Sequence, residues 1–256
     1  MTELANESFG RGKPHLTFLH GFTQTRESWR AVADRLAPAH RITLVDLPGH
    51  GDSTARPPTL DDAGRLIGEL AAGSVLIGYS MGARIALHAA LQPGSELKGL
   101  VLIGAHPGIV DTTERLHRQK TDAELADRIL EIGVEMFLQE WLNQPMFEGV
   151  RELDHRDRLR NSSVGLAYAL DTFGTGIQGV LDAELHHVNV PTLLLAGDRD
   201  VKFIDLAVRI RTRLKEATFE TIAHAGHACH LEQPEETSRT IQVWLDRLGK
   251  SDSDSQ

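Results

Sequence analysis

Five short apolar segments recur along the chain and predict buried β-strands. They are "HLTFLH" (15–20), "RITLVD" (41–46), "SVLIGY" (74–79), "LKGLVLIG" (97–104) and "VPTLLLAG" (190–197). Each segment ends in a glycine or a charged turn, which is typical of strands buried on both faces. The later segment "TFETI" (218–222) is also strand-like.

Helical patterns lie between several of these strands. Around 26–37, the apolar residues Trp29, Val32, Ala33 and Leu36 fall on one helical face. Helices are also expected at 81–92, 202–215 and 235–248. An alternation of strands and helices predicts an α/β fold, with a mostly parallel sheet covered by helices on both faces.

The alternation stops between residues 106 and 185, where no segment has a good strand pattern. Two amphipathic stretches, 122–142 and 154–173, predict helices there instead. We interpret 106–185 as a helical insertion, here called the lid, over the open end of the sheet. Residues 1–105 and 186–256 then form the core domain.

Composition narrows the class of protein. The 256 residues are 41% apolar and 25% charged, which is ordinary for a globular protein. A net charge of −9 argues against binding to nucleic acid or to anionic membranes, so we expect a small-molecule partner. The N-terminus lacks a signal-peptide pattern and the single cysteine, Cys229, fits a reducing compartment. We therefore expect a cytoplasmic protein. The sequence does not indicate an oligomeric state.

The segment Gly78-Tyr79-Ser80-Met81-Gly82 matches the pattern G-x-S-x-G. It follows an expected strand and opens an expected helix, which is the context that a nucleophile elbow requires. In such an elbow the serine hydroxyl projects above the sheet at a helix N-terminus. Ser80 is therefore the candidate reactive residue.

A reactive serine needs a base and a group that orients the base. After the last strong strand, Asp198 and Asp200 both compete for the orienting role, and we favour Asp200 because it lies deeper in its loop. Near the C-terminus, His227 follows a glycine after a strand-like segment, which favours it as the base. The spacing of His224, His227 and His230 also permits a metal site.

No further set of carboxylates or cysteines completes such a metal site, so we expect neither a metal nor a cofactor. An oxyanion hole requires backbone N–H donors. We expect one from Met81, directly after the serine, and one from Phe22 in the loop "HGFTQ" (20–24).

The motifs together resemble the α/β-hydrolase superfamily, across nearly the whole chain. They are "HGF" (20–22), "DLPGHGDS" (46–53), "GYSMG" (78–82), "GDRD" (197–200) and "AGH" (225–227). A narrower resemblance comes from "YSMGAR" (79–84), "GDRDVKF" (197–203) and the lid segments "RLHRQKTDAELA" (115–126), "EWLNQPMF" (140–147) and "RLRNSSVGLAYAL" (158–170). These are similar to the 2-succinyl-6-hydroxy-2,4-cyclohexadiene-1-carboxylate synthases, the pyruvate-eliminating enzymes of menaquinone biosynthesis.

The resemblance implies a role for each matching residue. Ser80, Asp200 and His227 would form a catalytic triad. The substrate of this family carries several carboxylates, and cationic side chains suit such a substrate. Arg158 is expected to face solvent. For Trp141 and Phe147, packing in the core of the lid is nearly as good an interpretation as contact with the substrate. The residues that the resemblance assigns to substrate binding are Tyr79, Arg84, Arg118, Trp141, Phe147, Arg160 and Lys202.

The implied reaction is a proton abstraction followed by loss of pyruvate, with Ser80 acting as a base that His227 activates. Two alternatives remain open at this point. The first is a serine esterase or carbon–carbon bond hydrolase, in which Ser80 forms an ester with a carboxylated substrate. The second is a non-catalytic protein of the same fold that only binds a ligand.

Overall fold

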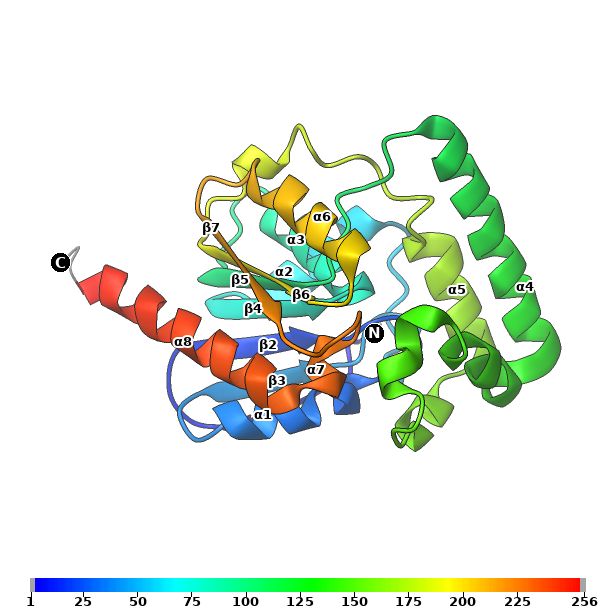
Figure 1. Ribbon diagram of the computed structural model, residues 1–256, viewed down its shortest axis with the longest axis horizontal. Coiled ribbons are helices and arrows are strands. Elements are labelled where there is room, and N and C mark those ends of the chain that lie inside the picture. The colour runs from blue at the N-terminus through cyan, green and yellow to red at the C-terminus, as the bar shows by residue number, and fades with distance from the viewer. Residues whose placement is uncertain (1–2, 254–256) are drawn as a thin grey trace.

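A seven-stranded sheet forms the centre of the computed structural model, which describes residues 3–253 and the side chains up to residue 249 (Figure 1). The strand order is β1-β3-β2-β4-β5-β6-β7, and only β1 runs antiparallel to its neighbour. The strands are β1 (Asn6–Gly10), β2 (His15–Leu19), β3 (Arg41–Val45), β4 (Ser74–Tyr79), β5 (Gly99–Ile103), β6 (Thr192–Gly197) and β7 (Ala217–Ile222).

The predicted α/β-hydrolase arrangement of a mostly parallel sheet is confirmed. The five apolar segments all hold strands, and the strand-like 218–222 lies within β7. The strand β1 was not expected from the sequence. It pairs with β3 at the edge of the sheet, and its side chains alternate between half-buried and exposed positions, so it lacks the continuous apolar run of the inner strands.

Helices cover both faces of the sheet, as Figure 1 shows. On one face α2 and α3 pack together and share an apolar cluster with α6. On the other face α1 contacts α8 around the fully buried Trp29. The core helices are α1 (Arg30–Leu36), α2 (Leu60–Leu70), α3 (Met81–Ala90), α6 (Val201–Arg211), α7 (Cys229–Glu232) and α8 (Pro234–Ser253).

Two further helices lie beyond the ends of the strands in Figure 1, at the place expected for the lid. They are α4 (Thr112–Leu142), which begins ten residues before the predicted helix, and α5 (Ser163–Phe173). The expected helix at 154–173 is only partly present, because Arg156–Arg160 form a short 3₁₀ turn. The two helices share a small apolar cluster that includes Ile129, Phe137 and Leu166. The lid bounds, 106–185, stay a prediction.

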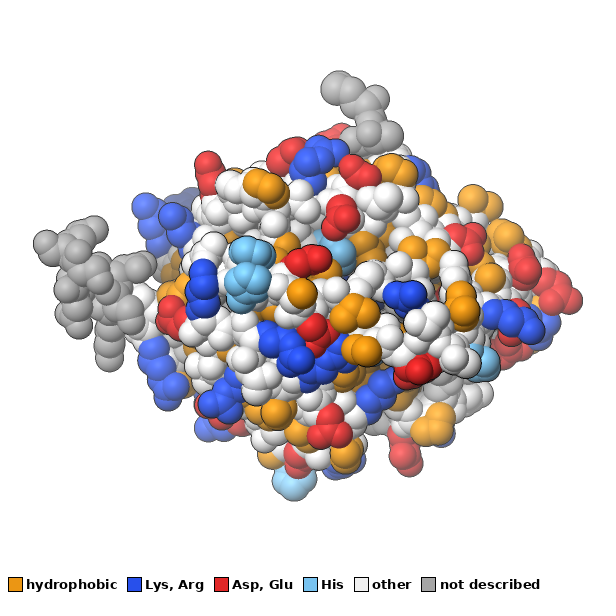
Figure 2. Space-filling model, turned by 90° about the horizontal axis from the view of Figure 1, so that it is seen from above, with side chains coloured by type: hydrophobic (Ala, Val, Ile, Leu, Met, Phe, Trp, Pro, Cys, Tyr) orange, Lys and Arg blue, Asp and Glu red, His pale blue; other side chains and the backbone are white. Residues whose placement is uncertain are grey.

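The surface shows how the net negative charge is distributed. Figure 2 shows acidic and basic side chains interspersed over the face seen from above, with apolar side chains between them. The acidic excess is therefore not gathered in one patch on this face. Among residues 3–253, no helix combines the length and the apolar character needed to cross a membrane.

Candidate active site

The turn from β4 into α3 holds Ser80 in a strained backbone conformation. Ser80 has φ 51° and ψ −107°, a combination that non-glycine residues rarely adopt. A Cβ on Gly78 would lie 2.5 Å from the carbonyl oxygen of Gly82, and one on Gly82 would lie 2.5 Å from that of Leu19. The two glycines of the motif are therefore required by backbone that crowds the turn on both sides.

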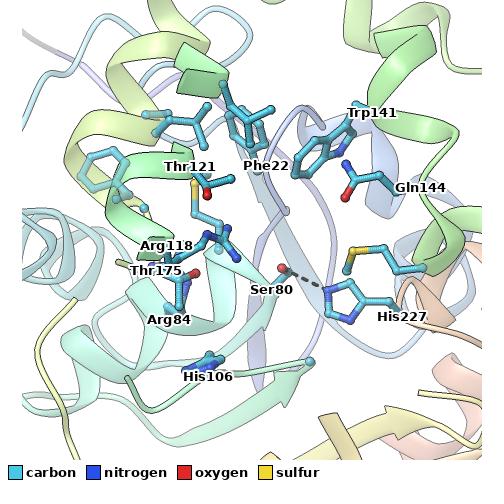
Figure 3. A pocket seen from close by; sticks show the side chains of 18 of the residues that line it. Phe22, Ser80, Arg84, His106, Arg118, Thr121, Trp141, Gln144, Thr175 and His227 are labelled. Atoms are coloured by element: carbon cyan, nitrogen blue, oxygen red, sulfur yellow. Dashed lines mark hydrogen bonds between the residues drawn. The ribbon is translucent and has the colours of Figure 1, made fainter. Parts of the chain in front are cut away.

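Three side chains from separate segments form a hydrogen-bonded row at this turn. His227 Nδ1 lies 2.7 Å from Asp200 Oδ2. On the other side of the ring, His227 Nε2 lies 3.3 Å from Ser80 Oγ, the contact that Figure 3 marks with a dashed line. A carboxylate can only accept, so Nδ1 carries the proton and Nε2 is free to accept one from the hydroxyl. This is the geometry that a serine, its base and an orienting acid require.

The competing aspartate has a different task. Asp198 accepts hydrogen bonds from the backbone N–H groups of His224 and Ala225, at 3.0 and 3.1 Å. It thereby fastens the turn that follows β7 and leads into the loop of His227, and its printed hydrogen bonds go to that backbone and not to His227. Of the two acids considered from the sequence, Asp200 is the one that contacts the histidine.

The histidines that suggested a metal site are not arranged as a ligand set. His227 is engaged by Asp200 and Ser80. His230 is fully buried, with its ring 4.3 Å from that of Tyr79 and 4.5 Å from that of Trp29. Among the described residues, no group of three or more potential ligands is placed to hold a metal ion. The metal alternative gains no support from this geometry.

The two residues expected to supply the oxyanion donors both line the cavity that contains Ser80. Met81 is the first residue of α3, so its N–H has no acceptor within the helix. Phe22 lies in the loop after β2 and lines the same cavity. A Cβ on the preceding Gly21 would lie 2.6 Å from the Tyr79 ring, which explains the glycine there.

A cavity of about 340 Å³ opens above Ser80, between the core and the lid. Its apolar wall combines Phe22 with the lid aromatics Trp141 and Phe147. The ring centroid of Trp141 lies 5.2 Å from that of Phe22 and 5.6 Å from that of Phe147. In Figure 3, Arg84 and Arg118 lie on one side of Ser80, whereas His227 lies on the other. A ligand in the cavity would therefore contact cations at one end and the histidine at the other.

Arg84 is buried without an acidic partner. Its side chain comes from α3, one turn after Ser80, and the residue is 7% exposed. Its Nη1 donates to the amide oxygen of Gln178 at 3.2 Å. Burial, reinforced by the nearby Arg118 charge, lowers the pKa of Arg84 to about 10, so the guanidinium remains charged near neutral pH. Its positive charge is available to a ligand.

Arg118 also lines the cavity but is paired. Its Nε donates to the buried carboxylate of Asp122, 2.7 Å away and one turn further along α4. The same carboxylate accepts from the backbone N–H of Gly176, beyond α5. Asp122 thus holds Arg118 in place and ties α4 to the segment that follows α5.

The structure corrects the prediction for the second half of the lid. Arg160 does not line the cavity: it pairs with Asp52 at the surface. Arg158, expected in solvent, is 3% exposed and lines the cavity. Burial lowers its pKa, and its Nη1 donates to the hydroxyl of Thr23 at 2.9 Å. Both residues lie in one short 3₁₀ turn, where residues two apart point in different directions, so one faces the cavity and the other the surface.

The remaining predicted contacts also reach the cavity. Tyr79 lines it while almost fully buried, and its ring lies 5.2 Å from that of His227. Lys202 follows the Asp200 turn, with its Nζ 5.9 Å from the centroid of the Phe203 ring. The family resemblance placed these side chains near the site, and their roles stay a prediction.

His106 is a cavity residue that no sequence motif singled out. It follows β5, and its Nδ1 accepts the backbone N–H of Gly108 at 3.0 Å. Burial, together with the charges of Arg84 and Lys202, lowers the pKa of His106 to about 3. The ring is therefore neutral, with its remaining proton on Nε2. Other polar residues that line the cavity are Gln24, Thr121, Gln144 and Thr175.

Comparison with known proteins agrees with this architecture. The model of the alpha/beta hydrolase family matches residues 18–240. A Klebsiella pneumoniae protein named 2-succinyl-6-hydroxy-2,4-cyclohexadiene-1-carboxylate synthase is 35% identical, over 87% of this chain and 90% of its own.

Two solved structures are similar as well. MenH from S. aureus is 28% identical, with a TM-score of 0.88 over 95% of this chain and 98% of its own. A malate-bound esterase from Thermogutta terrifontis is 25% identical, with a TM-score of 0.79 over 96% of this chain and 94% of its own. The protein is an enzyme of the α/β hydrolase family, and it belongs with the relatives in that family that are named 2-succinyl-6-hydroxy-2,4-cyclohexadiene-1-carboxylate synthase.

Proposed function

We propose that the protein eliminates pyruvate from 2-succinyl-5-enolpyruvyl-6-hydroxy-3-cyclohexene-1-carboxylate and so forms 2-succinyl-6-hydroxy-2,4-cyclohexadiene-1-carboxylate. The names of its relatives suggest the product. The observation that carries the proposal is the pair Arg84 and Arg158. Both are buried in the wall of the Ser80 cavity, and neither forms an ion pair with a carboxylate of the described residues.

A buried charge without a counter-ion is unfavourable, so two of them in one cavity favour an anionic ligand. Guanidinium groups also match carboxylates in a two-pronged geometry. The substrate carries several carboxylates, which would supply the missing counter-ions. Arg118 and Lys202 line the same cavity and would add further positive charge.

In the proposed reaction Ser80 acts as a base toward carbon. Its oxygen takes a proton from a ring carbon while its own proton passes to His227 Nε2. The electrons of the broken C–H bond form a new double bond in the ring, the existing ring double bond shifts, and the bond from the ring to the enolpyruvyl oxygen breaks. The enolate that leaves takes up the proton that His227 holds and becomes pyruvate. Asp200 would stabilise the resulting imidazolium, and the N–H groups of Phe22 and Met81 would stabilise the negative charge that develops on the substrate.

The cations and the aromatic wall would fix the substrate relative to Ser80. Orientation of this kind can contribute several kcal/mol to a rate. The lid residues Trp141 and Phe147, which line the cavity opposite the core, would exclude water from the reaction. The exclusion of water favours elimination over hydrolysis.

The product ratio tests this proposal. Purified protein is mixed with the substrate, generated enzymatically in place, and pyruvate and the ultraviolet absorbance of the diene are followed together. We expect both in a one-to-one ratio, and a loss of at least about 1,000-fold in kcat for Ser80→Ala. Pyruvate without the diene would indicate a hydrolase, and a covalent adduct on Ser80 during turnover would contradict its role as a base.

A further inference from the structure

The loop that carries Phe22 contains a residue in an unusual conformation. Residues 21–24 form a turn that the N–H of Gln24 closes onto the carbonyl of Gly21 at 3.2 Å. Thr23, at the third position of the turn, has φ 67°. Turns with a positive φ at this position favour glycine or asparagine, and a β-branched residue adopts it only under constraint.

The constraint on Thr23 comes from three hydrogen bonds. Its N–H donates to His50 Nε2 at 3.3 Å. Its hydroxyl accepts from Arg158 Nη1 at 2.9 Å, and its carbonyl accepts from Asn161 Nδ2 at 2.8 Å. Thr23 is fully buried, so each polar atom depends on these partners. Two of the three partners come from the lid segment 158–161.

Asn161 joins this loop to a second one. Its Oδ1 accepts the backbone N–H of Gly51 at 2.8 Å, in the segment after β3. A backbone N–H only donates and a carbonyl only accepts, so the two contacts fix the orientation of the amide. Asn161 is 6% exposed. It therefore holds two core loops in a defined position relative to the lid.

We propose that Asn161 is a positioning residue that keeps Thr23 in its left-handed conformation and thereby sets the direction of the Phe22 N–H in the oxyanion hole. The inference rests on the proposed function for the role of that N–H. If φ of Thr23 relaxed to a negative value, the hydrogen bond from the Gln24 N–H to the Gly21 carbonyl would break and the turn would open. The Gly21 carbonyl and the Phe22 N–H belong to the same peptide group, so that group would lose its fixed direction. The N–H would then no longer point at the charge that forms above Ser80.

Asn161→Asp tests the proposal with almost no change of shape. The carboxylate still accepts from Gly51, but an oxygen replaces the donor to the carbonyl of Thr23 and repels it. Oxyanion donors act mainly in the transition state, so we expect kcat to fall by about tenfold or more, with KM within about twofold. Asn143→Asp is the matched control in the lid, because Asn143 is exposed and is not among the described residues that hydrogen-bond to Thr23.

Repeating the Asn161 substitution in a Thr23→Gly variant distinguishes a positioning role of Asn161 from a general loss of structure. Glycine adopts a positive φ without strain, so Thr23→Gly removes the need for the clamp. In this background we expect Asn161→Asp to reduce kcat less than about threefold, which is a strongly non-additive result. An equal loss in both backgrounds, an unchanged kcat, or a loss confined to KM would overturn the proposal.

Hydrogen exchange provides a readout that does not depend on the reaction. The N–H groups of Thr23 and Gln24 are both hydrogen-bonded, so their exchange reports opening of the turn. We expect residues 21–25 to exchange about tenfold faster in Asn161→Asp than in the wild type or in Asn143→Asp. Unchanged exchange would overturn the inference, whereas absence of pyruvate release by the wild type would count against the proposed function alone.

Discussion

At the scale of single residues, the partners of the arginines decide what each arginine can bind. Arg118 has a buried carboxylate, Asp122, at 2.7 Å. Among the described residues, the side-chain hydrogen-bond partner of Arg84 is the neutral amide of Gln178, which in turn donates to the carbonyl of His106 at 2.9 Å. A neutral partner orients a guanidinium without cancelling its charge. Gln178, 1% exposed, therefore keeps Arg84 available for a ligand.

Gln178→Glu tests this argument. The new carboxylate would pair with Arg84 and compete with a substrate carboxylate. We expect KM to rise about 10- to 100-fold, which corresponds to the loss of one hydrogen bond between Arg84 and a substrate carboxylate. The unfolding temperature should change little. Gln92→Glu, beyond the far end of α3 and outside the cavity, is the control. An unchanged KM with normal folding would contradict the role of Gln178.

Sequence patterns could identify some of these residues and not others. Ser80, Asp200 and His227 lie at fixed places relative to strand ends, and the structure brings their side chains together. The resemblance selected Arg160 and left Arg158 in solvent, whereas the folded chain places Arg158 in the cavity wall, because residues 156–160 form a 3₁₀ turn and not part of the continuous helix expected at 154–173. Gln178 lies in a loop without a motif, so only the folded chain reveals it.

At the scale of elements, the secondary structure predicted from the sequence is wrong where tertiary contacts override or weaken the local pattern of apolar residues. The edge strand β1 was missed because half of its side chains face solvent. Helix α2 was not among the expected helices, although Thr59 caps it through the N–H of Asp62. The longest helix, α4, is broken at Gly133, whose φ of 78° and ψ of 169° lie in a region that is open almost only to glycine.

The break in α4 can be tested by Gly133→Ala. Nothing lies within 4 Å of a Cβ added there, so any effect arises from the backbone and not from a clash. We expect the free energy of unfolding to fall by about 1–3 kcal/mol in urea titrations. Gly179→Ala, equally open but without a positive φ, should change it by less than about 0.5 kcal/mol. Equal effects of the two substitutions would show that the Gly133 conformation imposes no constraint.

At the scale of the whole molecule, buried histidines link stability to pH. Burial lowers the pKa of His20 to about 4 and that of His50 to about 3. Burial also lowers the pKa of His230 well below its ordinary value. These rings stay neutral in the folded protein, whereas in the unfolded chain they bind protons near pH 6.5. Below that pH the unfolded state binds more protons, so acid favours unfolding.

The free energy of unfolding should therefore fall as the pH is lowered from 7 to 5. The loss should be about 2 kcal/mol for each fully buried histidine, and it should continue until the folded-state pKa is reached. Denaturant titrations at pH 7, 6 and 5 measure it. His50→Gln should make the dependence shallower, and His187→Gln, at an exposed position, should not. A stability that is constant from pH 7 to pH 5 would contradict this account.

The central claim is that the buried arginines of the cavity, and not those at the surface, bind the carboxylates of the substrate. Arg158 and Arg160 offer a matched pair, two residues apart in one turn, with only Arg158 in the cavity. The decisive measurement is steady-state pyruvate release by Arg158→Met and Arg160→Met beside the wild type. We expect kcat/KM to fall by about 100-fold or more for Arg158→Met and by less than about threefold for Arg160→Met. Equal losses, or a larger loss for Arg160→Met, would contradict the account.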